Sequence, residues 1–265
     1  MPAKKSASKK SAKKSSLNAA LAKPAKALAA KAPAKIKDKF DAKRDLARER
    51  VGEILKRLAA TYPNAECALH HRNAWELLVA TILSAQCTDV RVNMVTPELF
   101  RQFPTPKAMS EASQPALEEI IRSTGFYRNK AKSILGAAKK ITNDFAGKVP
   151  RTLAELTTVP GAARKTANVV LGVAYGLAEG IVVDTHVLRI SRRLHLTQAT
   201  EPKQVEQDLI SIIPKDHWIA YSHEIIHHGR QICIARKPKC ADCTLETICT
   251  SGDKTWSSGK AWPND

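Results

Sequence analysis

The chain has 265 residues, of which 43% are hydrophobic, so it is long enough for one large domain or two small ones around a real core. Its 43 basic and 25 acidic residues give a formal net charge of +18, which predicts a polyanionic partner, with nucleic acid ahead of an anionic membrane surface. Apolar runs of membrane-spanning length and the apolar core of a secretory signal are both missing from the sequence. We therefore expect a soluble, intracellular protein without a membrane partner.

The first 37 residues carry much of this charge. They contain eleven lysines, no arginine and no acidic residue, among Ala, Ser and Pro. Large apolar side chains are too few to offset the conformational entropy lost on folding, so we predict a disordered basic tail over residues 1–38. Two interpretations stay open, a mobile polycation that strengthens nucleic-acid binding and a solvated extension without a selected role. A mitochondrial transit peptide is a third, although such segments favour arginine.

Helical patterning begins at about Asp38. Apolar residues then recur every three or four positions, as in Val51, Ile54, Leu55 and Leu58, in Ile134, Leu135, Ala138 and Ile141, and in Val205, Leu209 and Ile212. The segment AWELLVATILSAQ is apolar on nearly every face, which predicts a helix buried within an all-α domain. Only residues 180–183 have an ambiguous, strand-like pattern. We therefore predict an all-α fold of about ten helices joined by short turns.

Four of the six cysteines are crowded into seventeen residues. They are Cys233, Cys240, Cys243 and Cys249, with the spacing C-x6-C-x2-C-x5-C. In an intracellular chain this crowding indicates metal ligation, and four thiolates accept either a [4Fe–4S] cluster or a structural zinc ion. Arg236, Lys237 and Lys239 lie between the first two ligands, where they either contact phosphates or form a solvated basic loop. The remaining Cys67 and Cys87 are predicted to be buried free thiols.

The stretch LTTVPGAARKTANVVLGVAYG combines a helix end, a tight turn at Pro160-Gly161 and a new helix. A turn that opens a helix presents unpaired backbone N–H groups, which bind a phosphate without reading sequence. Lys165 falls in the first turn of the new helix, where the helix dipole favours the neutral amine that a nucleophile needs. From position alone, an ordinary surface lysine is the simpler interpretation.

Three segments of the chain resemble one known family. VPGAARKTANVVL is similar to the helix-hairpin-helix of the endonuclease III family, and IVVDTHVLRISRRL is similar to its catalytic-aspartate segment. The cysteine spacing matches the iron–sulfur loop of that family at every interval. Together these resemblances span residues 45–249.

The resemblance implies an all-α fold with two helical subdomains, a six-helix barrel with the helix-hairpin-helix and an iron–sulfur cluster domain, with the active-site cleft between them. The implied parts are a discontinuous cluster domain of residues 39–66 and 178–249, a six-helix domain of residues 67–177 with the hairpin near residues 155–176, and a carboxyl-terminal tail of residues 250–265. It also implies that the four crowded cysteines hold a [4Fe–4S] cluster.

The function implied by the resemblance is DNA repair by base excision. The enzyme would be a bifunctional DNA glycosylase and AP lyase that removes oxidised pyrimidines and cleaves 3′ to the abasic site by β-elimination. Lys165 matches the family lysine that displaces the base and forms a Schiff base with the opened deoxyribose. Asp184 matches the catalytic carboxylate that stabilises positive charge on the sugar; a helix N-cap is its simple interpretation, and the two roles are compatible. The implied partner is double-stranded DNA with damaged bases or abasic sites, bound by a monomer.

Chemistry on a base in a duplex requires that the nucleotide be extruded and the gap filled. Gln86 and Phe126 match the two wedge positions of the family, whereas the alternatives are a polar residue beside the core and a core aromatic. Ser84 and Asp89 are expected to line the base pocket. The expected DNA contacts are Gln86, Phe126, Pro160, Gly161, Ala162, Ala163, Arg164 and Lys237. Ala163 often has a glycine as its family counterpart, and alanine costs roughly 1 kcal/mol there if the backbone is left-handed.

Three competing hypotheses are weighed against this one. Residues 223–227 fit the H-E-x-x-H signature of zinc proteases, but the sequence names neither a third ligand nor a substrate cleft. A monofunctional glycosylase of the adenine-mismatch type generally lacks the lysine that Lys165 matches. A DNA-binding module without activity would lack Lys165 or Asp184, and both are present. The expected location is the cytoplasm, with the nucleoid, in a bacterium, and the nucleus or mitochondrion in a eukaryote.

Overall fold

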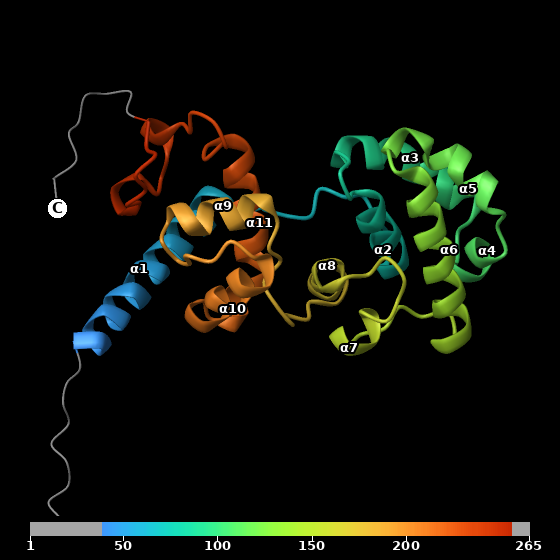
Figure 1. The fold of residues 1–265 in the computed structure, drawn as a ribbon, viewed down its shortest axis with the longest axis horizontal. Coiled ribbons are helices and arrows are strands. Elements are labelled where there is room, and N and C mark those ends of the chain that lie inside the picture. Colours follow the sequence, from blue (N-terminus) through green and yellow to red (C-terminus); the bar gives the residue numbers. More distant parts are fainter. Residues whose placement is uncertain (1–38, 256–265) are drawn as a thin grey trace, which may run out of the picture. The chain divides into compact units, whose positions relative to one another are not determined.

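The computed structural model describes residues 39–255, with side chains from Glu49 onward, so the predicted basic tail lies outside the described residues. This part of the chain contains eleven α-helices and no strand (Figure 1). The helices are α1 (Lys39–Thr61), α2 (Ala74–Leu83), α3 (Asp89–Gln102), α4 (Pro106–Ser110), α5 (Gln114–Ile121), α6 (Tyr127–Asp144), α7 (Leu153–Leu156), α8 (Arg164–Tyr175), α9 (Thr185–Arg193), α10 (Pro202–Ile212) and α11 (Trp218–Gln231). Short 3-10 turns are η1 (Arg122–Thr124), η2 (Lys215–His217), η3 (Cys240–Asp242) and η4 (Glu246–Ile248). The prediction of an all-α fold is confirmed. Within these residues, none of the helices has the length and apolar character needed to cross a membrane.

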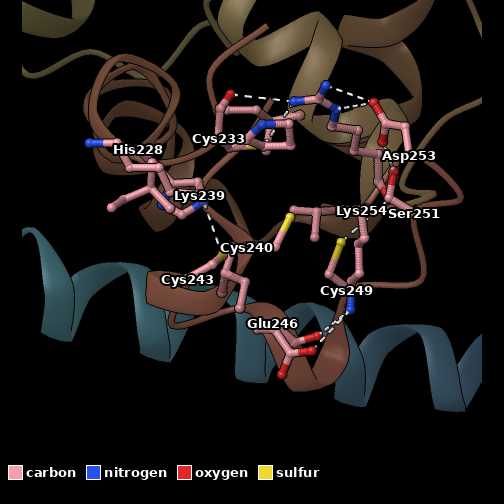
Figure 2. A pocket seen from close by; sticks show the side chains of 16 residues that line it. His228, Cys233, Lys239, Cys240, Cys243, Glu246, Cys249, Ser251, Asp253 and Lys254 are labelled. Carbon is pink, nitrogen blue, oxygen red and sulfur yellow. Dashed lines mark hydrogen bonds and ion pairs between the residues drawn. The ribbon is translucent and has the colours of Figure 1, made fainter. Parts of the chain in front are cut away.

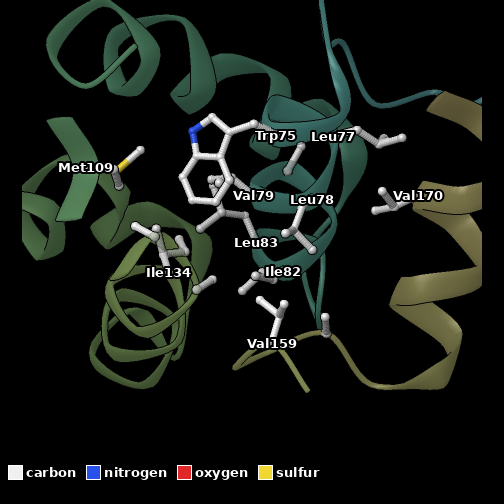
Figure 3. Packing of buried hydrophobic residues seen from close by; sticks show 14 of the residues in the cluster. Trp75, Leu77, Leu78, Val79, Ile82, Leu83, Met109, Ile134, Val159 and Val170 are labelled. Carbon is white, nitrogen blue, oxygen red and sulfur yellow. The ribbon is translucent and has the colours of Figure 1, made fainter. Parts of the chain in front are cut away.

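Buried apolar side chains form two separate clusters. One draws its residues from α2 to α8, between Leu69 and Leu171, and is shown around α2 in Figure 3. The other combines α1 with α9, α10 and α11, so the amino-terminal helix shares a core with the last helices of the chain. Burial of apolar surface is the main stabilising term in each cluster.

Helix α2 is the centre of the first cluster. Its residues Leu77, Leu78, Val79 and Ala80 have no exposed surface, although four consecutive positions point in all directions around a helix. The prediction of a helix buried on nearly every face is therefore confirmed. Its amino end is capped by Asn73, whose side chain accepts a hydrogen bond of 3.0 Å from the Glu76 backbone N–H.

The segment with the ambiguous pattern, residues 180–183, connects α8 to α9 and forms no strand. The Val182 backbone N–H donates to the Ser222 hydroxyl of α11 at 3.1 Å. At Gly180 an added Cβ would lie 2.1 Å from Glu206 Oε1, so only glycine fits beneath that carboxylate. Side chains of α10 and α11 thus contact this segment and limit which residues fit in it.

Candidate active site and cysteine cavity

Lys165 and Asp184 line one cavity together with the predicted pocket residues Ser84 and Asp89. Its other lining residues come from α2 and the segment before it, from α8 and the segment after it, and from α11; they include Glu66, Cys67, Asn168, Trp218, His223, His227 and Arg230. Residues far apart in the sequence thus surround one space that contains an amine and a carboxylate. An amine and a carboxylate together can perform nucleophilic and acid–base chemistry.

The backbone N–H groups at the amino end of helix α8, beside Lys165, have no side-chain cap. Ala163 is the N-cap residue and offers no side-chain hydrogen bond, whereas side chains cap α2, α3, α4, α5, α7 and α9. Its φ of −64° and ψ of 166° are ordinary extended values, so the cost considered for alanine at this position does not arise. The first-turn N–H groups of α8 are therefore available to an external acceptor such as a phosphate.

The turn before α8 is packed closely against α2 and α6. Gly161 has a φ of +81°, and an added Cβ would lie 3.0 Å from Ser133 Cβ and 3.1 Å from Ile82 Cδ1. At Gly136 of α6, an added Cβ would lie 3.0 Å from Pro160 Cβ. The hairpin thus packs so closely that an extra carbon at either glycine would require its neighbours to shift.

Gly161→Ala is expected to lower the free energy of unfolding by about 1–3 kcal/mol, because alanine resists the left-handed backbone. Thermal unfolding followed by circular dichroism measures this, at roughly 2–4 °C per kcal/mol for a domain of this size. The control is Gly52→Ala in α1, where an added Cβ meets nothing within 4 Å and a gain of about 0.5–1 kcal/mol is expected. Equal melting temperatures for Gly161→Ala and the unchanged protein would contradict the strain argument.

Arg164 has a partner within the protein. Its Nε donates to Glu206 Oε2 at 2.7 Å and its Nη2 donates to Glu206 Oε1 at 3.0 Å. Asn168 Nδ2 also donates to Glu206 Oε1, at 3.0 Å. This bidentate pair links α8 to α10 behind the hairpin. The guanidinium predicted to contact DNA is thus engaged with a buried carboxylate in this structure.

Asp184 is the N-cap of α9, as the sequence predicted. Its Oδ1 accepts hydrogen bonds of 2.8 Å from the backbone N–H groups of His186 and Val187. These bonds fix the carboxylate at the edge of the cavity. Within the described residues Oδ2 accepts no hydrogen bond, so one carboxylate oxygen can serve the chemistry while the other caps the helix.

Both predicted pocket residues make polar interactions within the protein. Ser84 is the C-cap of α2, and its hydroxyl donates to the Thr81 carbonyl at 2.9 Å. Asp89 forms an ion pair with Arg230 of α11, at 2.6 Å between Oδ2 and Nη2. The ion pair joins the first turn of α3 to a helix of the other core.

The predicted wedge residues Gln86 and Phe126 are exposed and stand in the left-handed region, with φ of 52° and 48°. Phe126 is 64% exposed, so the alternative that it is a core aromatic is wrong. Lys237 is also exposed, with a φ of 54°. Cys67 and Cys87 are free thiols but only partly buried, which corrects the expectation that both are buried.

Figure 2 shows the second candidate site, a cavity lined by all four crowded cysteines. Backbone and side-chain N–H groups point at the sulfur atoms: Arg193 Nη1 donates to Cys233 Sγ at 3.3 Å and the Thr255 N–H donates to Cys240 Sγ at 3.4 Å. His228 Nε2 lies 3.6 Å from Cys243 Sγ. Such donors favour thiolates over thiols, which is the form that ligates a metal.

Burial opposes this ionisation in the protein alone. It raises the pKa of the Cys233 and Cys249 thiols and raises the pKa of Cys243 to about 12. Arg193 acts in the other direction on Cys233, through its hydrogen bond and its charge. Buried thiols of raised pKa ligate as thiolates when a positive centre compensates them.

Sequence reasoning missed the contribution of α11 to the first cavity. His223, His227 and Arg230 all line it, and their spacing of four and then three residues marks one helix face. The two histidines of this face lie inside the H-E-x-x-H match, which was the signal in the sequence. Its Glu224 is buried away from the cavity, with a pKa raised by burial. The glutamate of that signature acts as general base beside the metal held by its two histidines, so a buried Glu224 that does not line their cavity disfavours the zinc-protease hypothesis.

Residues 79–215, slightly more than half of the chain, match the family described as HhH-GPD superfamily base excision DNA repair protein. Endonuclease III of Synechocystis sp. is 52% identical over 204 residues, which span 77% of this chain and 93% of that protein. Endonuclease III of Bacillus subtilis is 43% identical, over 77% of this chain and 94% of that protein. A solved structure described as a trapped endonuclease III–DNA covalent intermediate has a TM-score of 0.73 and 43% identity, over 77% of this chain and 95% of that one. The chain therefore belongs to the endonuclease III family, and the resemblance found in its motifs is confirmed.

Proposed function

We propose that this protein is a bifunctional DNA glycosylase and AP lyase of base excision repair that removes oxidised pyrimidines from duplex DNA. The observation that carries the proposal is the shared cavity of Lys165 and Asp184, which come from two helices of different cores. Family membership supports the reaction class. The relatives come from bacteria, so we propose that it acts on the bacterial chromosome, in the cytoplasm.

In this proposal Lys165 is the nucleophile. Its Nζ lone pair forms a bond to C1′ of the deoxyribose while the glycosidic bond breaks. The departing base takes the electron pair of the glycosidic bond and a proton. Nζ then loses a proton as the sugar ring opens to a protonated imine. Removal of a proton from C2′ expels the 3′ phosphate, and water later releases the sugar from the lysine. The covalent DNA adduct in the description of a solved relative supports this route.

Asp184 supplies the negative charge in the same cavity. Positive charge develops on the sugar as the base leaves, and a fixed carboxylate stabilises it more than it stabilises the neutral substrate. The two backbone N–H groups on Oδ1 hold the carboxylate in place before the substrate arrives. We assign it a second role, accepting a proton from Lys165 so that the amine is neutral when it attacks.

Duplex DNA is the proposed partner, held through its phosphates. The amino end of α8 offers backbone N–H groups beside the turn at Pro160-Gly161, and Lys237 adds an exposed charge. Gln86 and Phe126 are proposed to enter the duplex and fill the gap left by the extruded nucleotide. Their exposure and their left-handed backbone support a role outside the core.

The test is incubation of the protein with duplexes that each carry one oxidised pyrimidine, with borohydride added to reduce an imine. A covalent adduct and a strand break on these duplexes are expected. Base release without an adduct or a break would indicate a monofunctional glycosylase, and binding without either would indicate a DNA-binding module. Since one assay reports substrate, reaction type and nucleophile, it separates all three hypotheses.

We further propose that Cys233, Cys240, Cys243 and Cys249 hold a [4Fe–4S] cluster. All four line one cavity, and N–H groups of Arg193 and Thr255 point at the sulfur atoms of Cys233 and Cys240, which suits thiolate ligands. Four thiolates accept either a zinc ion or a cluster, and membership of the endonuclease III family supports the cluster, which would compensate the buried thiolates. When bound, it would cross-link the segment of residues 233–249 and so hold the proposed DNA-contacting Lys237 in place.

The purified protein is expected to be yellow-brown and to contain about four irons and little zinc. Metal analysis checks this, and one zinc without iron would overturn the cluster assignment. Cys240→Ser should lower the iron content, the melting temperature and DNA binding. The reason is that the cluster would stabilise the buried cysteine cavity and does not contact the reacting atoms. A Cys240→Ser protein that keeps its iron and fails only in base release would contradict this structural role.

The domain boundaries are also part of the proposal. Residues 39–66 with 178–249 are assigned to the cluster domain, and residues 67–177 to the six-helix domain. The two clusters of buried apolar side chains support this division, because one includes α1 with α9 to α11 and the other includes α2 to α8. The protein is proposed to act as a monomer.

Residues 1–37 lie outside the described residues, but their charge permits a prediction. Removing them should weaken DNA binding at low salt and make it less dependent on salt, with a change in the log–log slope of about 0.9 for each phosphate that these lysines neutralise. Catalysis at saturating DNA should persist. Binding measured by fluorescence anisotropy at several salt concentrations checks this, and an unchanged slope would show that the eleven lysines neutralise no phosphate.

A further inference from the structure

Lys130 of α6 is a buried lysine that the proposed chemistry does not use. It is only 5% exposed, and burial lowers its pKa. Its Nζ donates two hydrogen bonds of 2.8 Å, one to the carbonyl of Leu83 and one to the carbonyl of Thr124. A buried ammonium is costly unless hydrogen bonds compensate it, so both bonds are needed in the folded protein.

The two carbonyls lie at equivalent places. Leu83 is the last residue of α2, and Thr124 is the last residue of η1. The carboxyl end of a helix leaves carbonyl groups without an intrahelical partner and carries the negative end of the helix dipole. One cation therefore satisfies two helix ends that are distant in the sequence.

Each of these helix ends leads directly into a wedge loop. Gln86 follows Leu83 by three residues, and Phe126 follows Thr124 by two. Both wedge residues have a positive φ, which non-glycine residues adopt only when surrounding structure holds them there. Because both side chains are exposed, packing of their own side chains does not supply that restraint. The Lys130 ammonium is an anchor that the bases of both loops share.

We propose that Lys130 is a positioning residue for base extrusion, which holds the two wedge loops to one point so that Gln86 and Phe126 enter the duplex together. The inference rests on the proposed wedge role of those two residues. An apolar side chain of similar length, such as methionine, would fill the same space without joining the carbonyls. The distinct consequence of the lysine is coupling between the loops.

Coupling of this kind is measured by a double-mutant cycle, because two residues that act as a unit give non-additive effects. The readout is the single-turnover rate of base release at saturating enzyme, on one lesion placed in a paired duplex and in a mismatch bubble. Extrusion is easier from the bubble, so the duplex-to-bubble ratio of rates reports on extrusion rather than on chemistry. The variants are Gln86→Ala, Phe126→Ala and their combination, each made with and without Lys130→Met.

With Lys130 present, each single change should lower the ratio, and the combination should lower it barely more than the stronger single change. Lys130→Met alone should lower the ratio roughly tenfold, a typical size for coupled residues. In the Lys130→Met protein, the effect of the combined wedge change should equal the product of the effects of Gln86→Ala and Phe126→Ala. Lys130→Arg, which keeps a cation, should recover part of the ratio. The matched control is Lys132→Met, an exposed lysine on the same helix, which should keep the original ratio.

Two results overturn the inference in distinguishable ways. If Gln86→Ala and Phe126→Ala both keep the original ratio, the wedge assignment itself is wrong and the inference falls with it. If each lowers the ratio but their effects multiply while Lys130 is present, the wedge function stands and Lys130 couples nothing. The second result needs no Lys130 variant, so it decides the matter even where Lys130→Met does not fold. If Lys130→Met lowered the rate of base release equally on duplex and bubble, Lys130 would have a structural role and no role in extrusion.

Discussion

Lys165→Gln is expected to abolish both the borohydride-trapped adduct and strand cleavage, with a rate loss on the order of 10⁶-fold, the scale seen when an enzyme loses a covalent nucleophile. Glutamine keeps the polarity and much of the length of the side chain but has no basic amine. Damaged DNA should still bind, because the N–H groups at the amino end of α8 belong to the backbone. The measurements are gel analysis of adduct and nicked strand, and a binding titration on the same duplex.

The control for this prediction concerns the other lysines of the chain. Residues 1–37 contain eleven, and a mobile amine can trap an abasic site by itself. The trapping assay is therefore repeated on protein without residues 1–37, where an adduct to Lys165 must survive. An adduct at the original level in Lys165→Gln would show that a different amine attacks.

Local patterns predicted α1, α2, α6 and α10 because their apolar residues recur at helical spacing or form an unbroken apolar run. The burial of α2 on nearly every face follows directly from its unbroken apolar sequence. The N-cap at Asp184 was predictable for the same reason, since a cap depends only on neighbours two and three residues away. Segment 180–183 remained ambiguous because its shape depends on partners in α10 and α11.

Hydrogen-bond partners that are far apart in the sequence could not be predicted from local patterns. Nothing near Arg164 indicates that its guanidinium pairs with Glu206, forty-two residues later. Lys130 follows the same rule, since its two acceptors are backbone carbonyls and any residue type can supply them. The local sequence therefore does not distinguish Lys130 from the other lysines of its helix. The shared cavity of Lys165 and Asp184 was expected only from the family resemblance, because the two residues belong to helices in different cores.

Asp184→Asn is expected to bind damaged DNA and to release the base about 10²–10³-fold more slowly, the usual size of losing one preorganised electrostatic group. Asparagine replaces a carboxylate by a neutral group of the same shape, so positive charge on the sugar loses its compensation. It still accepts the hydrogen bonds from His186 and Val187 through its side-chain oxygen. The melting temperature should therefore change little, since asparagine is as good an N-cap as aspartate.

Asp184→Ala separates the two roles of this side chain, because it removes the cap together with the charge. It should lose base release to the same extent as Asp184→Asn and should also lose about 1 kcal/mol of stability, the usual value of an N-cap. Single-turnover base release and thermal unfolding of both variants provide the comparison. If Asp184→Asn released the base at the original rate while Asp184→Ala did not, the carboxylate would be a helix cap alone, and the charge that stabilises the sugar would have to come from another residue of the cavity, such as Glu66.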